Sequence, residues 1–360
     1  MAVKEKNPVF VIAEAGVNHN GKMDLAEELV RVAESSGADA VKFQTFRAQN
    51  LVTKYADKAE YQKILTAESS QLRMLEKLEL SYEAHEKLAT LCGDLGIQFL
   101  STAFDHESLD FLANVLKMSL FKIPSREITN GPLLLEYSKT GGDLILSTGM
   151  ADLDEIREAL GVLAFGMTFD DCEPSRDKFL KAYESDVARD ILKKKVTLLQ
   201  CTTDYPTRDE DVNLRAIETM RNEFDLPIGL SDHTGGITAA IAAASLGCVT
   251  IEKHITLDRG LPGPDHQASI EPGDFTRMVA GIRQVSNMLG DGIKKPSNRE
   301  GMNRSIVRKS IVAKTNIQIG EKLTTANLAI KRPGTGKSPM EYWDSLGTAS
   351  TRSYFKDDVI

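Results

Sequence analysis

PVFVIAEAG, at residues 8–16, is the first of eight short apolar runs that each end in polar residues. The other seven are ADAVKFQTF (38–46), IQFLSTAF (97–104), LFKIPS (120–125), DLILSTG (143–149), VTLLQCT (196–202), PIGLSDH (227–233) and VTIEKHIT (249–256). Their content of Val, Ile, Leu and Phe is typical of strands that are buried on both faces of a parallel sheet. Helix-like segments separate most of them. A strand–helix unit repeated eight times predicts an α/β fold, the (β/α)8 or TIM barrel.

Polar side chains stand at or just beyond the carboxyl ends of these runs. In a TIM barrel those ends gather at one mouth, where active sites form. The side chains expected there are Glu14, Lys42, Gln44, Thr102, Lys122, Ser125, Ser147, Tyr205, Ser231, His233 and His254. A purely structural barrel does not need such groups at every strand end, so the pattern favours an enzyme.

The length of the chain predicts a second domain. At 360 residues, the chain exceeds one barrel of about 250 residues. We expect the catalytic barrel at 1–290, a polar linker at 291–302 and a small, mostly β domain at 303–360, where short β-like runs alternate with turns.

Composition narrows the class of protein. No apolar run is long enough to span a membrane, and the N-terminus has no signal-peptide core. The four cysteines show no CxxC spacing, which favours reduced thiols in a cytoplasmic protein. One of them, Cys201, either faces the mouth or serves as a small buried hydrophobe.

The charge distribution favours a small anionic substrate. The net charge is −8, whereas residues 301–360 hold ten Lys or Arg and five Asp or Glu. No aromatic residues are interleaved with the basic ones, so we expect no nucleic-acid partner.

Two histidines are candidate metal ligands. His233 and His254 end neighbouring runs, where two imidazoles can reach one ion and leave open positions for a Lewis acid. The alternative is that each histidine only forms hydrogen bonds at the rim. His19 is a further candidate for the mouth, and His85, in a helix-like segment, is expected at the surface.

Two lysines are candidate anion-binding groups. Lys42 and Lys122 lie within apolar runs and share the predicted mouth with several hydroxyl groups, which suits a phosphate or a carboxylate. Such lysines can instead form Schiff bases. The accompanying hydroxyls favour a phosphate, and they belong to Thr102, Ser125 and Ser147.

Acidic residues complete the predicted site. Glu14 is placed to orient a water or a sugar hydroxyl, or to act as a base. Asp232 and Glu252 flank the histidines, and we expect both to point away from the mouth as supporting groups in the barrel wall. The insertion at 47–80 is expected to form part of the substrate wall, and the one at 161–195 a helical elaboration.

The ordered motifs resemble one family. They read VIAEAGVNHNG, AVKFQTF, STAF, FKIPS-x-EITN, LSTGM, LLQCTTDYPT, IGLSDHT, IEKHITLD and GPDHQAS, and together they resemble the sialic acid (N-acetylneuraminate) synthases. The tail KSIVAKTNIQIGEKLTTANLAIKRPGTG resembles that family's antifreeze-like (SAF, β-clip) domain. The resemblance covers nearly the whole chain.

The resemblance implies a reaction and a site. It implies that phosphoenolpyruvate condenses with N-acetylmannosamine and water to give N-acetylneuraminate and phosphate, with cleavage of a carbon–oxygen bond. It also implies a divalent ion, Mn²⁺ with Mg²⁺ or Co²⁺ as alternatives, at His233 and His254. The implied catalytic residues are Glu14, Lys42, Lys122, His233 and His254. The implied substrate-binding residues are Gln44, Thr102, Ser125, Glu127, Ser147, Tyr205, Ser231, Asp265 and Arg332. The resemblance further implies a domain-swapped homodimer in which Arg332 of one subunit contacts the sugar's acetamido group in the other.

Three alternatives to this function remain open, and one residue departs from the family's sequence pattern. The acceptor is alternatively a diacetamido-dideoxy sugar, giving legionaminic or pseudaminic acid. The chain is alternatively another phosphoenolpyruvate aldol enzyme, or a non-catalytic sugar-binding barrel. Arg126 stands where the family usually has glycine, in KIPSGE. Its side chain adds a phosphate contact, obstructs the pocket or points to solvent.

Overall fold

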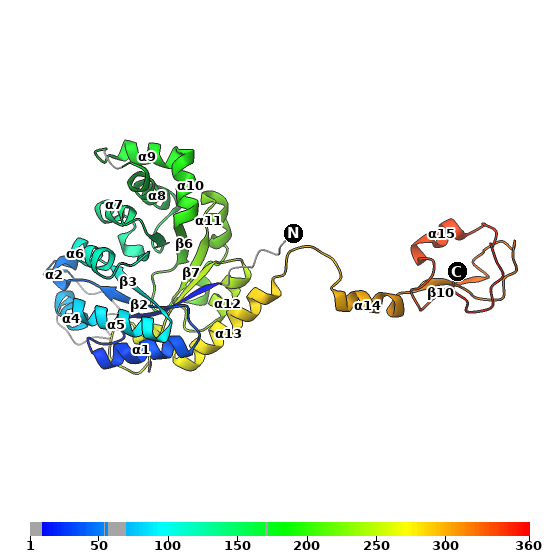
Figure 1. Cartoon of the computed structure of the whole chain (residues 1–360), viewed down its shortest axis with the longest axis horizontal. Coiled ribbons are helices and arrows are strands. Elements are labelled where there is room, and N and C mark those ends of the chain that lie inside the picture. The colour runs from blue at the N-terminus through cyan, green and yellow to red at the C-terminus, as the bar shows by residue number, and fades with distance from the viewer. Residues whose placement is uncertain (1–8, 54, 57–69, 170–171) are drawn as a thin grey trace. The chain divides into compact units, whose positions relative to one another are not determined.

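The computed structural model describes residues 9–53, 55–56, 70–169 and 172–360 (Figure 1). Part of the predicted substrate wall, residues 54 and 57–69, lies outside the described residues. The chain divides into two compact units, Met1–Gly290 and Asp291–Ile360. Each unit is described by itself.

Eight parallel strands form the sheet of the first unit. They are β1 (Phe10–Gly16), β2 (Ala40–Thr45), β3 (Gln98–Ala103), β4 (Leu120–Ile123), β5 (Asp143–Ser147), β6 (Val196–Cys201), β7 (Ile228–Asp232) and β8 (Thr250–His254). The hydrogen-bonded order is β3-β2-β1-β8-β7-β6-β5-β4, so β1 pairs with both its successor and the last strand. β3 and β4 lie side by side and complete the ring. The predicted TIM barrel is confirmed.

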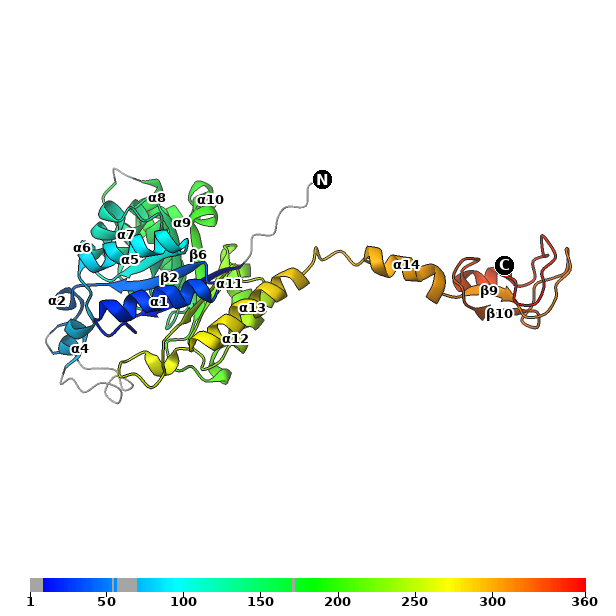
Figure 2. The same cartoon turned by 60° about the horizontal axis from the view of Figure 1, so that its bottom comes forward.

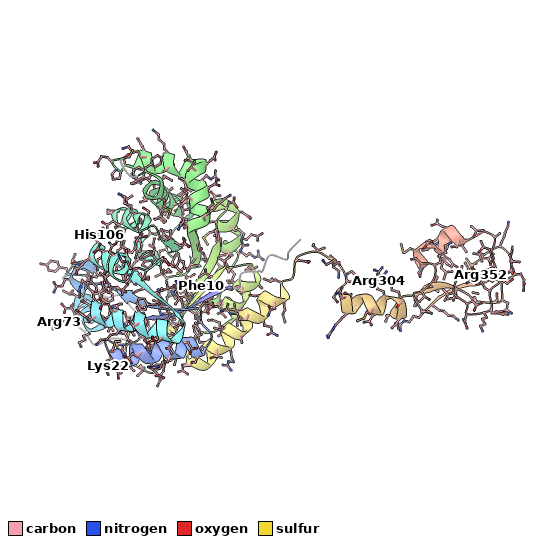
Figure 3. All side chains as sticks on the ribbon, viewed as in Figure 1. Phe10, Lys22, Arg73, His106, Arg304 and Arg352 are labelled. Atoms are coloured by element: carbon pink, nitrogen blue, oxygen red, sulfur yellow. The ribbon has the colours of Figure 1, made fainter. Side chains whose placement is uncertain are left out.

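Helices surround this sheet in both views (Figures 1 and 2). Polar side chains such as Lys22, Arg73 and His106 project from the outside of this unit (Figure 3). The α-helices are α1 (Met23–Ser35), α2 (Ala48–Leu51), α4 (Gln71–Leu78), α5 (Tyr82–Leu95), α6 (His106–Asp110), α7 (Gly131–Lys139), α8 (Leu153–Thr168), α9 (Arg176–Glu184), α10 (Asp186–Lys195), α11 (Ala216–Phe224), α12 (Thr238–Ser245) and α13 (Pro272–Met288). Shorter turns of helix are η1 (Phe111–Val115), η2 (Ser125–Glu127), η3 (Asp209–Asp211) and η4 (His266–Ala268).

The helical elaboration expected at 161–195 is present. It comprises the end of α8 followed by α9 and α10, which lead back into β6. Helix α8 begins with a capping box, because the Asp152 carboxylate accepts from the Glu155 amide while the Glu155 side chain accepts from the Asp152 amide. No described helix has the length and apolar character needed to cross a membrane.

Side chains fill the barrel interior in layers. One apolar layer consists of Ile12, Ala40, Leu100, Ile145 and Leu199. Because strand side chains alternate between the two faces, the residues two positions further along each strand point into the same interior, nearer the carboxyl ends. Those positions carry polar groups, and they form the floor of the pocket described below. The outward-facing residues pack beneath the helices in a second and larger apolar core.

The second unit is small and has its own core. Its elements are α14 (Asn298–Val307), β9 (Ser310–Ala313), β10 (Leu328–Lys331), η5 (Pro339–Glu341) and α15 (Tyr342–Ser345). β9 and β10 form an antiparallel pair. Helix α14 runs across the predicted boundary between linker and small domain. The core residues are Ile311, Ala313, Ile317, Leu323, Leu328 and Tyr354.

Candidate active site at the barrel mouth

A pocket opens at the carboxyl ends of the barrel strands. Twelve of the residues predicted from the sequence line it: Glu14, Lys42, Gln44, Thr102, Lys122, Ser125, Ser147, Tyr205, Ser231, His233, His254 and Asp265. Six others line it as well: Phe104, Pro124, Arg126, Cys201, Thr203 and Glu252. The alternation of side chains along each strand therefore located most of the pocket.

Three candidate residues lie elsewhere. Glu127 is buried beside the pocket wall, where its carboxylate accepts a hydrogen bond of 2.7 Å from the Asn130 amide. His19 is buried outside the pocket, and its Nδ1 accepts from the Gly21 amide. Arg332 belongs to the second unit, directly after β10.

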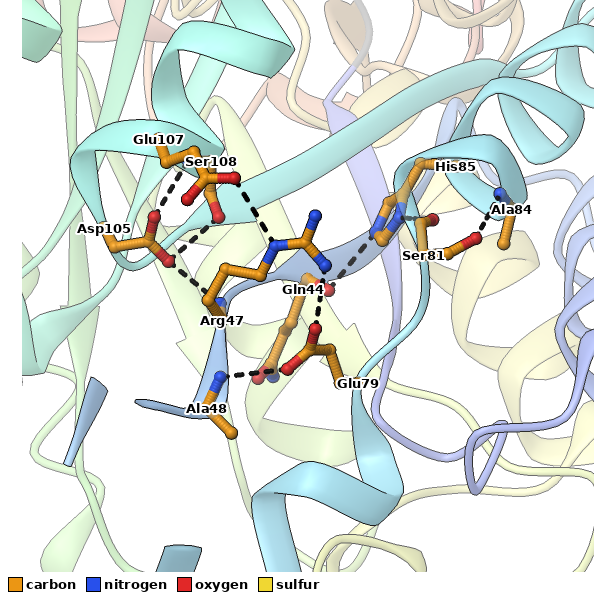
Figure 4. Close-up of polar contacts among 10 residues, drawn as sticks. All are labelled: Gln44, Arg47, Ala48, Glu79, Ser81, Ala84, His85, Asp105, Glu107 and Ser108. Carbon is orange, nitrogen blue, oxygen red and sulfur yellow. Dashed lines mark hydrogen bonds and ion pairs between the residues drawn. The ribbon is translucent and has the colours of Figure 1, made fainter. Parts of the chain in front are cut away.

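The prediction that His85 lies at the surface is wrong. His85 is fully buried on the inner face of α5, between the rings of Phe99 and Phe111. Its ring nitrogens lie 2.9 Å from the Ser81 carbonyl oxygen and 3.3 Å from the Gln44 carbonyl oxygen (Figure 4). The helical spacing of residues 85, 88 and 92 could have revealed this buried face.

A network after β2 fixes the segment that follows Gln44. The Arg47 guanidinium donates to Glu79 at 2.9 Å, and the Arg47 amide donates to Asp105 at 3.0 Å (Figure 4). Glu79 also accepts from the Ala48 amide. These contacts tie the loop after β2 to the loop after β3, so they hold two parts of the pocket rim together.

Four buried charged groups form the floor of the pocket. Lys42 Nζ lies 2.6 Å from Glu14 Oε2 and 3.5 Å from Glu252 Oε2. Lys122 Nζ lies 3.4 Å from Glu252 Oε1. Lys42 also donates to the Thr102 hydroxyl at 3.2 Å. Glu252 thus holds two ammonium groups that would otherwise repel each other across the barrel.

The prediction that Glu252 points away from the mouth is wrong. Glu252 precedes His254 by two residues on β8, and residues two apart on a strand face the same side of the sheet. Its Oε1 accepts from the Ser231 hydroxyl at 2.7 Å. Asp232 is one residue from His233 and does face the other side, where it pairs with Lys253.

Burial and mutual charge set the protonation of this cluster. Burial raises the pKa of Glu14 to about 7, against the lowering effect of Lys42. Burial also acts to raise the pKa of Glu252, but the charges of Lys122 and Lys42 outweigh it and hold that pKa below its usual range. Glu252 is therefore the more acidic of the two carboxyls, and the pKa of Glu14 lies closer to neutrality.

The pKa values of the two lysines shift in opposite directions. Burial lowers the pKa of Lys122, which Glu252 offsets only in part. For Lys42 the nearby carboxylates of Glu14 and Glu252 outweigh the lowering by burial and raise the pKa. Lys42 is therefore a fixed positive charge at the centre of the pocket.

The two histidines fit a divalent cation that is open to further ligands. Their ring centroids are 5.3 Å apart. His233 Nδ1 lies 2.7 Å from the Thr202 carbonyl oxygen, so it carries a proton, and the Nε2 lone pair is available in the neutral ring. Burial lowers the pKa of His233, but Cys201 and the Thr202 carbonyl outweigh it and raise that pKa, so an ion bound here has to displace a proton. His254 Nδ1 is buried and has no hydrogen-bond partner among the described residues. Burial, with a further contribution from His233, holds the pKa of His254 well below its usual value, which keeps it neutral as a metal ligand must be.

These imidazoles are the candidate protein ligands. Within the described ranges, no group of three or more His, Cys, Asp or Glu side chains is arranged to hold a metal ion. Any ion here would therefore keep positions for substrate or water, as catalytic metal sites do.

A buried ion pair behind the pocket fixes the ends of β7 and β8. Lys253 Nζ lies 2.8 Å from Asp232 Oδ2 and also donates to the carbonyl and the hydroxyl of Thr234. Both charged side chains are almost completely buried. Since His233 and His254 follow these residues directly, the pair sets the positions of both imidazoles.

Replacing Lys253 by methionine should destabilise the barrel. The change leaves the Asp232 carboxylate buried without its cation, which costs about 3–5 kcal/mol in comparable pairs. Denaturant unfolding followed by circular dichroism measures the free energy. The matched control is Lys193→Met, because Lys193 forms an exposed pair with Asp225 and its loss should change little. Equal stability of the two variants would mean that the buried pair does not hold the strands.

Comparison with known proteins identifies the family of this chain. The NeuB family model matches residues 29–294, and the SAF domain model matches residues 308–360. The N,N'-diacetyllegionaminic acid synthase of Campylobacter jejuni serotype O:2 is 46% identical over 352 residues, which is 98% of each chain. The N-acetylneuraminate-9-phosphate synthase of Mus musculus is 31% identical over 99% of this chain and 92% of its own.

A solved structure extends the likeness. The N-acetylneuraminic acid synthetase of Leptospira borgpetersenii serovar Hardjo-bovis, in complex with citrate, superimposes with a TM-score of 0.66 and 28% identity. The match covers 84% of this chain and 94% of that one.

The fold and the pocket define a (β/α)8 barrel with a polar pocket at the carboxyl ends of its strands. The chain belongs to the NeuB family of sialic-acid-type synthases and carries a SAF domain at its C-terminal end. The resemblance found in the sequence is thereby confirmed.

Proposed function

We propose that the protein condenses phosphoenolpyruvate with a diacetamido-dideoxy sugar aldehyde and water, giving a legionaminic-acid-type nine-carbon 2-keto acid and phosphate. The observation that carries this proposal is the 46% identity to a diacetyllegionaminic acid synthase, against 31% to a synthase of the N-acetylneuraminate branch. These values favour the diacetamido acceptor over N-acetylmannosamine, which the sequence motifs alone had placed first.

The side of the pocket near β2 to β5 suits phosphoenolpyruvate. Lys42 and Lys122 supply positive charge, and hydroxyls of Thr102, Ser125 and Ser147 surround them. The Ser147 hydroxyl is buried and has no hydrogen-bond partner among the described residues, which supports a role in holding a ligand oxygen.

Gln44, Tyr205 and Asp265, which line the same pocket, are the candidate groups for the acceptor sugar. The centroid of the Tyr205 ring lies 4.2 Å from that of the His233 ring. Gln44 Nε2 donates to Glu14 Oε1 at 3.3 Å, which places the proposed sugar-binding amide beside the proton-exchanging carboxyl. Two reactants held in one pocket meet in fixed geometry, which lowers the entropic part of the barrier.

His233 and His254 would hold a divalent cation, with manganese the expected metal and magnesium or cobalt the alternatives. When bound, such an ion supplies Lewis-acid polarisation of the aldehyde. Lys42 and Lys122 orient the enol substrate by its negative charges. The third carbon of phosphoenolpyruvate bonds to the aldehyde carbon as water adds to the second carbon. Glu14, with its pKa near 7, takes a proton from that water, and a proton passes to the former aldehyde oxygen. The hydroxyl on the second carbon then gives its proton to the phosphate, which leaves with its bridging oxygen as the keto group forms.

Phosphate release from phosphoenolpyruvate, assayed with a panel of acetamido sugars and added manganese, tests this proposal. We expect the highest kcat/KM with the diacetamido-dideoxy sugar that gives legionaminic acid. An oxygen label in the bridging position should appear in the phosphate. A preference for N-acetylmannosamine would instead assign the chain to the N-acetylneuraminate branch, and label retained in the sugar acid would contradict the mechanism.

We also propose, from the sequence resemblance, a homodimer in which Arg332 of one subunit serves the barrel of its partner. The inactive variants His233→Ala and Arg332→Ala, unfolded and refolded together, should then regain activity. A heterodimer holds one site with both residues intact, so up to about half of its sites recover. Heterodimers that form but remain inactive would contradict the exchange.

A further inference from the structure

Arg126 lies on the pocket wall, where the ring of Phe104 restrains its guanidinium. It lies in η2, the short turn after β4, between two residues whose side chains are buried. Its own side chain is exposed and lines the pocket together with Phe104 and Asp265. The guanidinium carbon lies 5.0 Å from the centroid of the Phe104 ring.

The guanidinium has no polar partner in the described part of the protein. No hydrogen bond or ion pair joins it to a described residue, and its contact is with the face of Phe104. Arg47, by contrast, is committed to Glu79 on the rim. A guanidinium has five N–H donors in a planar fork, and stacking on an aromatic ring restrains the fork without using those donors.

Arg126 forms no hydrogen bond or ion pair with a described residue, and Asp265 is an acidic group close enough to feel its charge. Lys42 and Lys122 are both paired with carboxylates on the pocket floor. Asp265 is buried, and burial raises its pKa while Arg126 acts in the opposite direction. Phosphoenolpyruvate carries a carboxylate as well as a phosphate. Each lysine on the floor already interacts with a carboxylate, and Arg126 on the wall supplies a further positive charge for this ligand.

We propose that Arg126 is an additional substrate-binding residue, whose guanidinium pairs with an anionic group of phosphoenolpyruvate. This inference rests on the proposed function. Two neighbours favour phosphoenolpyruvate over the acceptor: Arg126 follows Ser125 directly, and its platform, Phe104, follows β3, which carries Thr102. Both hydroxyls belong to the proposed phosphoenolpyruvate side.

Calorimetric titration with phosphoenolpyruvate alone tests the contact without requiring turnover. Arg126→Gln should weaken binding about tenfold or more, as the loss of hydrogen bonds to a charged group typically does. Arg126→Lys keeps the charge without the fork and should lose less. Arg176→Gln is the matched control, because Arg176 is an exposed arginine on α9 outside this pocket, and it should bind as the wild type does. In steady-state assays, KM for phosphoenolpyruvate should rise while KM for the sugar stays constant.

The outcomes separate this inference from the proposed function. Wild-type protein that does not bind phosphoenolpyruvate would overturn both. Wild-type binding with an unchanged or tighter Arg126→Gln variant would overturn the inference alone, and tighter binding would mean that the side chain obstructs the pocket. A change confined to KM for the sugar would also overturn it, by assigning Arg126 to the acceptor. Thermal melting of each variant confirms that all are folded.

Discussion

His233→Ala is expected to leave the barrel folded and to reduce turnover by roughly a hundredfold or more, because Lewis-acid stabilisation contributes several kcal/mol. Among the described residues, His233 and His254 are the two imidazoles on the pocket wall, and the buried Nδ1 of His254 has no protein partner. Phosphate release measures the loss, and titration with Mn²⁺ should show weaker metal binding in the same variant.

Removal of the metal should reproduce the effect of that substitution. Chelator-treated wild type should lose turnover and regain it when manganese is added. The matched control for His233→Ala is His106→Ala, because His106 is an exposed histidine that contacts Glu136 away from the pocket. This variant should keep wild-type turnover. Full activity in metal-stripped protein would overturn the proposed role of both imidazoles.

Glu14→Gln is expected to lower kcat by about a hundredfold or more, the contribution typical of a positioned general base. Glutamine keeps the shape of the side chain and can still accept from Gln44, but it cannot take a proton. Phosphoenolpyruvate should bind at least as tightly, since Lys42 loses one of its two carboxylate partners and keeps Glu252.

This combination of slow turnover and retained binding separates proton transfer from simple damage to the pocket. Glu158→Gln, which removes an exposed carboxylate paired with Arg176 on α9, is the control and should behave as the wild type does. An active Glu14→Gln variant would assign the proton transfer to another group or to solvent.

Much of the site could be predicted because strand side chains repeat every two residues. Once Glu14, Lys42 and Ser147 are placed at strand ends, the alternation puts them all inside one mouth. The same rule gives the wrong prediction for Glu252 only when it is misapplied, since positions 252 and 254 share a face. Asp232, one residue from its histidine, was placed correctly.

Other features depend on register and on loop geometry. Glu14 is the ladder partner of Lys42 on one side and of His254 on the other, and no local pattern specifies that register. The burial of His85 follows from the packing of α5. The stacking of Arg126 on Phe104 joins two loops that are distant in sequence, so it could not be read from either segment.

The Lys253–Asp232 pair has a consequence for how this pocket can change through evolution. The pair lies on the face of the sheet opposite the pocket, so no substrate touches it, yet it fixes the strand ends that carry both imidazoles. Of the side chains proposed to bind the acceptor, Gln44 and Asp265 have no part in this pair, whereas the Tyr205 ring packs against both imidazoles. Substitutions at positions 44 and 265 are therefore expected to change the sugar preference while the pair keeps the imidazoles in place, and substitutions at Tyr205 are expected to disturb both.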